Sequence, residues 1–473
     1  MKRTLSFLLI ASLALIISCK KEYSLPAITA PVNQSVEVGA DIDLTFNYTA
    51  EGGFSSSNLV STKGTSVIKT DGVTGSESGT IVVTFTAGTA EGAGSVVLTL
   101  SDDESQSASA TAVLDIVGVP TVSVTENISE NSTWETGKIY ILEGRISVLS
   151  GVTLTIQPGV IVKGREGAGS NATALLIARG GKLMAEGNAS SPIIFTSTAD
   201  QILPGEISSP NLEPTLNGLW GGVIILGNAP ISADAPAVGI EGIPPSDLNG
   251  LYGGTDPLDN SGSIKFISIR HGGANIGEGN EINGLTLGGV GSGTVIENIE
   301  IIANQDDGIE FFGGTVSVSN AVVWNTGDDA IDTDQSWAGT LDNFIVINPG
   351  DECFELDGAE GSMEARHSII NGTIKAGDAE GLADLDDNSI VTMNNLYFFG
   401  LKAGQDLDLN PAGLTVSSLE TTLPDGALIT DFFKGGSDTA VTIVAAGART
   451  VGATVTDFQT WSWTSVSGAL TGF

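Results

Sequence analysis

A short asparagine-centred motif recurs through the second half of the chain, and it constrains the fold more than any other feature. Each copy places an Asn within a short apolar, β-prone run. The copies lie 22, 23, 28 and 24 residues apart, at Asn298, Asn320, Asn343, Asn371 and Asn395. A repeat near 22 residues with short strands and no helical periodicity is typical of one coil of a parallel β-solenoid. The sequence therefore predicts a solenoid of stacked strands.

Stacking predicts what the asparagines do. Equivalent residues in neighbouring coils lie about 4.8 Å apart. An amide both donates and accepts hydrogen bonds, so we expect these side chains to form a buried, stacked ladder. The 28-residue spacing predicts a loop insertion at 358–365. Two segments rich in Gly, Pro and Asn, 198–219 and 233–262, are expected to leave the solenoid as loops, and long loops on a rigid scaffold often build a binding cleft.

The asparagine ladder resembles the right-handed parallel β-helix of the pectate lyase-like superfamily. Earlier segments such as 154–164, 175–187 and 282–289 resemble a group of Bacteroidetes-type surface lipoproteins with β-helix domains. The resemblance implies an all-β chain with a right-handed parallel β-helix over residues 120–410. The repeat fades beyond that point, so residues 411–473 are expected to form a C-terminal cap over the open end of the solenoid.

Two further segments precede the β-helix. Residues 27–118 contain short, alternating β-prone runs separated by Gly, Ser, Asn and Asp, which predicts a β-sandwich. This segment resembles the immunoglobulin-like spacer domains of bacterial surface proteins. Residues 1–18 have a basic start and an apolar stretch of signal-peptide length, ending at Cys19 in a sequence similar to a lipobox.

The lipobox resemblance implies a signal peptide over 1–18, a lipidated Cys19, a linker over 19–26, and anchoring to the outer membrane at the cell surface. An ordinary cleaved signal peptide is the alternative. Once the first segment is removed, Cys353 is the one remaining free thiol, so no intramolecular disulfide is expected.

Composition narrows the possible ligands. Acidic residues outnumber basic ones 56 to 19, for a formal charge of −37. Nucleic acids and anionic lipid surfaces are unfavourable partners for such a chain, whereas metal cations and cationic ligands are favourable ones. Two histidines do not support a His-rich zinc or iron centre.

The acidic residues follow the same repeat as the asparagines. Asp-Asp-Gly-Ile-Glu recurs one coil later as Asp-Asp-Ala-Ile-Asp, and again as Asp-Glu-Cys-Phe-Glu. Stacked carboxylates repel by roughly 3 kcal/mol at about 5 Å and an effective dielectric near 20. Ca²⁺ suits such a site, because it takes 6–8 oxygen ligands with loose geometry, whereas Mg²⁺ demands a tight octahedron. The alternative is a solvated acidic face that repeats for structural reasons. The predicted calcium ligands are Asp306, Asp307, Glu310, Asp328, Asp329, Asp332, Asp351, Glu352 and Glu355.

The segment 325–332 is similar to the Asp-Asp-Gly-Ile-Asp calcium motif of one β-helical pectate lyase family. That resemblance implies calcium ligands among the acids named above and a base about one and a half coils downstream. Lys375 is the nearest match, with Arg366 as an alternative base and His367 as a further weak candidate. Paired Asp residues also occur in polygalacturonases, but the Gly-His-Gly and Arg-Ile-Lys segments of those enzymes are missing here.

Two functions remain open on this evidence. One is a non-catalytic surface module that binds Ca²⁺ together with a polysaccharide or a partner protein. The other is a Ca²⁺-dependent, pectate-type polysaccharide lyase acting by β-elimination, in which a base removes a proton that Ca²⁺ has acidified. The scarcity of basic residues favours binding without catalysis.

Overall fold

The computed structural model describes residues 21–276, 282–407 and 411–473. The chain divides into two compact units between Gly118 and Val119. Cys19, the predicted lipidation site, lies outside the described residues. Over the described ranges, no helix has the length and apolar character needed to cross a bilayer.

The first unit consists of two four-stranded sheets, as the alternating sequence predicts. One sheet has the order β1-β3-β6-β5 and the other β2-β8-β7-β4; every pairing is antiparallel except β2 with β8. Alternate apolar residues such as Phe46, Phe85 and Leu98 are fully buried. The strands are β1 (Ala27–Thr29), β2 (Gln34–Glu37), β3 (Asp41–Thr49), β4 (Phe54–Thr62), β5 (Gly64–Thr70), β6 (Ser78–Ala87), β7 (Gly92–Asp102) and β8 (Ser107–Val117).

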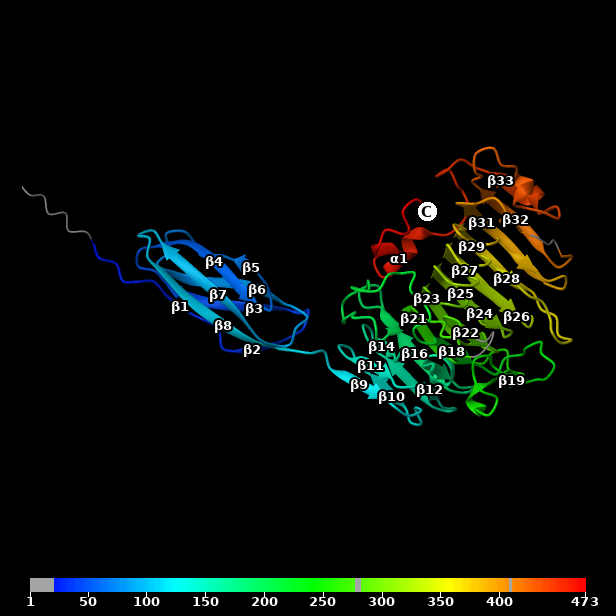
Figure 1. The fold of residues 1–473 in the computed structure, drawn as a ribbon, viewed down its shortest axis with the longest axis horizontal. Coiled ribbons are helices and arrows are strands. Elements are labelled where there is room, and N and C mark those ends of the chain that lie inside the picture. Colours follow the sequence, from blue (N-terminus) through cyan, green and yellow to red (C-terminus); the bar gives the residue numbers. More distant parts are fainter. Residues whose placement is uncertain (1–20, 277–281, 408–410) are drawn as a thin grey trace, which may run out of the picture. The chain divides into compact units, whose positions relative to one another are not determined.

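The second unit is a parallel β-helix, which confirms the predicted fold (Figure 1). Its strands form two sheets that run along the stack of coils, and the core lies between them. The long sheet has fifteen strands. These are β9 (Thr121–Val124), β10 (Ser132–Trp134), β11 (Ile139–Leu142), β13 (Thr153–Ile156), β14 (Ile161–Gly164), β16 (Lys182–Glu186), β17 (Ile193–Ser197), β21 (Gly262–Arg270), β23 (Val295–Ile302), β25 (Val318–Trp324), β27 (Thr340–Ile347), β29 (His367–Lys375), β31 (Val391–Phe399), β32 (Thr415–Thr421) and β33 (Val441–Ile443).

The short sheet has eight strands, all parallel, with one strand in each coil, whereas the first coils contribute two strands each to the long sheet. Its inward residues, such as Phe311, Ile331 and Leu356, join the core of the coil, whereas their neighbours point outward. The strands are β12 (Arg145–Val148), β15 (Ala174–Ile177), β18 (Val223–Leu226), β22 (Leu285–Gly288), β24 (Ile309–Phe312), β26 (Ile331–Asp334), β28 (Glu355–Leu356) and β30 (Asp384–Leu385).

The repeated asparagines stand where the strands of the long sheet bend. All five have a positive φ of 56–59°, a left-handed conformation that Asn tolerates better than most residues. Asn320 donates to Asn298 at 3.1 Å and Asn343 donates to Asn320 at 2.6 Å, while Asn395 donates to Asn371. Asn371 departs from the pattern and donates to Asp342 at 2.6 Å.

The stacked ladder is therefore confirmed, but its predicted burial is wrong. The five asparagines are half-buried, not buried. Each one sits at a bend where the preceding residue is also half-buried and the following residue turns into the core. Ile299 and Ala321, which follow two of these asparagines, are buried in the core of the coil.

The segment predicted to cap the solenoid does three different things. β32 and β33 continue the long sheet beyond residue 410, so the boundary expected there falls inside the coil. Phe432 and Phe433 then join the core of the coil. Residues 449–473 instead pack along the side of the long sheet: α1 (Trp463–Val466) begins there, and the backbone N–H groups of Trp463 and Thr464 donate to the buried Glu300.

The predicted loops lie outside the coil strands. Residues 198–222 and 357–366 contain no strand, and the segment between β18 and β21 contains only the small pair β19 (Val238–Gly239) and β20 (Leu251–Tyr252). Ile240 and Ile243 of this last insertion pack on outward residues of the short sheet, including Leu176 and Ile224. One end of that outer face is therefore apolar and covered.

Candidate metal site

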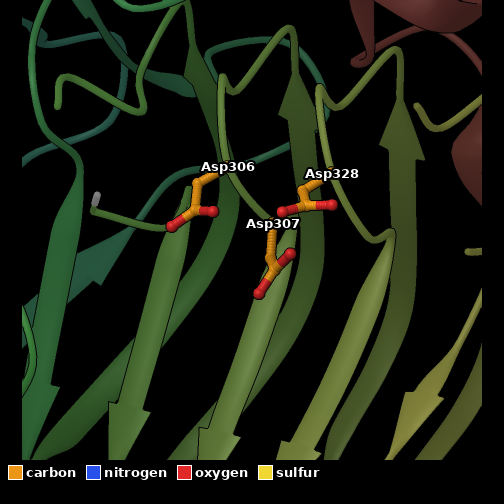
Figure 2. Close-up of side chains that lie close together, drawn as sticks. All are labelled: Asp306, Asp307 and Asp328. Carbon is orange, nitrogen blue, oxygen red and sulfur yellow. The ribbon is translucent and has the colours of Figure 1, made fainter. Parts of the chain in front are cut away.

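Two consecutive acidic residues lie in the turn that leads into each of three successive strands of the short sheet. In Figure 2, the carboxylates of Asp306 and Asp307 from one turn gather with that of Asp328 from the next coil. Three rows of acids result, each with one member per coil. We call them the outer row (Asp306, Asp328, Asp351), the middle row (Asp307, Asp329, Glu352) and the strand row (Glu310, Asp332, Glu355).

Backbone pairing holds these rows in register. In the strand row, Glu310 pairs with Asp332, and Asp332 pairs with Glu355. In the middle row, the Asp307 carboxylate accepts from the N–H of Asp329 at 3.0 Å, and the Asp329 carboxylate accepts from the N–H of Glu352 at 2.6 Å. The nine predicted residues thus line one face of three adjacent coils.

Seven of the nine fall into three overlapping triads. Within each triad, one ligand oxygen per residue lies within 4.8 Å of the others. Two oxygens bound to one Ca²⁺ are separated by at most about 5 Å, twice the usual Ca–O distance. The triads therefore have the spacing that a calcium ion requires. They are Asp306–Asp307–Asp328, Asp307–Glu310–Asp332 and Asp328–Asp329–Asp351; Glu352 and Glu355 lie outside them.

The innermost carboxyls are nearly removed from water. Asp307, Glu310, Asp329 and Asp332 are 3–8% exposed. Burial, followed by the charges of neighbouring acids, raises the pKa of Asp307, Glu310 and Asp332 well above the usual range. Burial and a hydrogen bond with Glu355 raise the pKa of Asp329 to about 10. Burial and neighbouring charges thus favour the protonated forms of these groups when no cation is bound, and a metal ion competes with protons for them.

Buried oxygen atoms around the second triad also fit a cation. The Asp332 Oδ1 atom is buried and has no hydrogen-bond partner among the described residues. The amide of Asn283, one coil earlier, donates to Glu310, and its Oδ1 atom is likewise buried and unpartnered within the described part of the chain. Unsatisfied buried acceptors are costly, and a metal ion is one partner that satisfies several at once.

Later coils treat their acids differently. Asp378 forms an ion pair with Lys402, and Asp406 forms one with Lys434. None of the ion pairs formed by the described residues includes Asp307, Glu310, Asp329 or Asp332. The same acidic face thus carries lysine counter-charges at its end but not at its centre.

Two of the three candidate bases, Arg366 and His367, make their contacts away from the acids. Arg366 donates to Val391 O at 2.9 Å, at the edge of the long sheet. His367 is 2% exposed, its ring lies 5.2 Å from that of Trp337, and burial lowers its pKa to about 3. Lys375 ends β29 of the long sheet, beside the inward-facing Ile374. The structure therefore places all three on or inside the long sheet, while the acids belong to the short sheet and its turns.

Two further acidic residues of this face were not predicted from the sequence. Asp334 and Asp357 continue the acidic face, and burial together with neighbouring acids raises the pKa of Asp334 to about 7 and that of Asp357 to about 6. The alternation of Asp332 with Asp334 along β26 is the signal that locates them, because alternate strand residues share a face. Asn283 lies in a coil whose sequence lacks the acidic repeat, so its place in the site could not be predicted.

The second unit is thus a parallel β-helix protein domain that carries an acidic cluster on one outer face. The chain belongs to the family described as "Pectate-lyase like beta helix domain", whose model matches residues 126–462. No curated protein sequence matches the chain significantly.

Solved structures give only distant similarities. The catalytic unit of the GH87 α-1,3-glucanase from Streptomyces thermodiastaticus is 13% identical with a TM-score of 0.28, over 81% of this chain and 71% of that one. The family 28 exopolygalacturonase of Yersinia enterocolitica is 10% identical with a TM-score of 0.17, over 90% and 85%. A mutant of the SrpA adhesin from Streptococcus sanguinis is 15% identical with a TM-score of 0.19, over 24% and 72%.

Proposed function

We propose that this protein is a cell-surface lipoprotein whose β-helix binds Ca²⁺ at the carboxylate rows and, through that ion, an anionic polysaccharide or a partner protein. The protein performs no catalysis at this site. One observation supports the proposal most directly: seven carboxylates from three coils form triads whose oxygen atoms are spaced as ligands of a single ion. A bound Ca²⁺ offsets their mutual repulsion and keeps positions for an external carboxylate or hydroxyl oxygen.

A lyase reaction needs a base next to the ion-bound substrate. Two of the residues predicted for that role, Arg366 and His367, make their contacts at the other sheet. This placement favours binding over β-elimination.

Thermal unfolding tests the calcium site. A ligand that binds only the folded state stabilises it by about 2.7 kcal/mol at a hundredfold excess over Kd. We expect chelator to lower the Tm and Ca²⁺ to restore it, with a smaller effect from Mg²⁺. A Tm indifferent to Ca²⁺ would refute the proposal. A glycan array probed with and without chelator then identifies the anionic ligand, since its retention must depend on Ca²⁺.

Lipid anchoring is tested separately. Two acyl chains hold a lipoprotein stably at the membrane. Substituting Cys19→Ala removes the side chain that carries the lipid, so no anchor remains. We expect the variant to move from the membrane fraction to the soluble fraction, and continued membrane attachment would contradict the lipobox interpretation.

A further inference from the structure

The insertion between β18 and β21 builds a pocket that the family resemblance does not account for. This open pocket has a volume of ≈ 460 Å³, within the range of about 300–1,000 Å³ typical of small-molecule sites. Its walls come from the insertion, from Phe312 at the end of β24, and from Gln335 and Glu360, which follow β26 and β28. The apolar lining residues are Ala233, Val238, Ile240, Ile243, Pro245, Tyr252 and Phe312.

The polar lining of this pocket is acidic. Asp234, Glu241 and Glu360 line it, and of the described residues that do so none is Lys, Arg or His. Gln335 fixes part of this arrangement, because its Oε1 atom accepts from the Tyr252 hydroxyl at 3.1 Å and its Nε2 atom donates to the Glu360 carboxylate at 3.3 Å. An apolar wall thus meets a negatively charged rim.

This combination selects among cations. A bare metal ion needs 6–8 oxygen ligands, and apolar walls do not supply them. The carboxylates repel an anionic ligand, and a purely apolar ligand makes no favourable contact with their charge. A protonated amine on an aliphatic chain satisfies both parts: its three N–H donors face carboxylates and its methylene groups lie on the apolar wall.

We propose that this pocket binds a primary alkylammonium group carried on an aliphatic chain, as in a free diamine or a lysine side chain. None of the residues that line this pocket belongs to the carboxylate triads. The ammonium group lies at the rim beside Glu360, and the chain lies along Ile240 and Ile243.

Calorimetric titration of the whole protein in chelator tests the proposal. The probes are 1,5-diaminopentane, a capped lysine tripeptide and, as an uncharged match, 1,5-pentanediol. We expect saturable binding of the diamine or the peptide, none of the diol, and weaker binding at high salt. The tighter of the two amines identifies whether a free diamine or a protein lysine is the natural source.

Variants complete the experiment. Glu360→Gln should weaken amine binding about tenfold, a loss of about 1.4 kcal/mol, while leaving the Ca²⁺ response of the Tm unchanged. Glu364→Gln, which changes an exposed acid on the same segment outside the pocket lining, is the matched control and should bind normally. Equal binding of diol and diamine, no amine binding, or unchanged binding by Glu360→Gln would overturn the proposal.

Discussion

Asparagines and carboxylates are both stacked from coil to coil, but they satisfy their hydrogen-bonding groups in different ways. The asparagine row of the long sheet satisfies itself, because each amide carries a donor and an acceptor, as the 3.1 Å contact between Asn320 and Asn298 shows. The carboxylate rows beside the short sheet contain acceptors only. Stacking brings Glu310 and Asp332 together without a donor between them unless one holds a proton.

The comparison shows that a repeat places equivalent side chains at equivalent positions, while their effect on stability depends on the chemical group. An amide row stabilises every coil added to it. A carboxylate row costs more with every coil, until protons, lysines or a metal ion compensate. In later coils, Lys402 and Lys434 compensate; at the centre, burial and neighbouring charges raise the pKa of Asp307, and the triads have the spacing to hold a cation.

Breaking the asparagine row should have the largest effect. Asn343→Ala removes the donor to Asn320 and the acceptor of the Thr454 N–H, and forces Ala to a φ of 56°. We expect a loss of about 3 kcal/mol in denaturant unfolding, irrespective of calcium. Asn343→Gly keeps the conformation accessible and should lose about half as much. Equal losses would show that backbone conformation contributes little.

The pH dependence should separate the two rows next. With chelator present, the raised pKa values of Asp357, Asp334 and Asp329 mean that the folded state binds more protons than the unfolded one above about pH 4. Stability then falls as pH rises from 5 to 8, by at most roughly 1.4 kcal/mol per pH unit for each carboxyl that stays protonated only in the folded state. Calcium should flatten this slope. A slope identical with and without calcium in Tm measurements would contradict the coupling.

The lysine-paired end of the face should respond least. Lys402→Met removes the partner of Asp378 in an exposed pair, with 56% and 76% of the two side chains accessible. Such pairs contribute about 0–1 kcal/mol. We expect a change below about 0.5 kcal/mol and an unaltered calcium response; a lost response would extend the metal site into these coils.

Much of this architecture could be predicted from the sequence, because period and conformation reinforce each other at the asparagines. The edge strands β4 and β5 have no clear signal in the sequence, since they are largely exposed and show little alternation of apolar residues. The positions of Lys375 and His367 also escaped it, because strand phase decides which side chains enter the core, and a one-residue shift reverses it. The backward path of the C-terminal segment depends on its contacts with Glu300, which lies 163 residues earlier in the chain.

The acidic rows themselves were predictable, but their protonation was not. Burial of Asp307 and Asp332 arises from how the turns pack, and sequence spacing gives no measure of it. Spacing likewise does not show that Glu352 and Glu355 fall outside the triads while Asn283 contacts the second one.

The double substitution Asp307→Asn with Asp332→Asn tests the central claim most directly, because it keeps shape and removes two buried carboxylates that share a triad. Its matched control is Asp384→Asn with Asp386→Asn, two exposed acids of a later coil. In chelator, the buried double variant should unfold at a higher Tm than the wild type, since Asn needs neither the proton taken up by a buried carboxyl on folding nor relief from its neighbours' charges. In calcium, its Tm should rise much less than that of the wild type and the control, because two of the three triads are lost. A double variant that keeps the full calcium response would contradict the metal site.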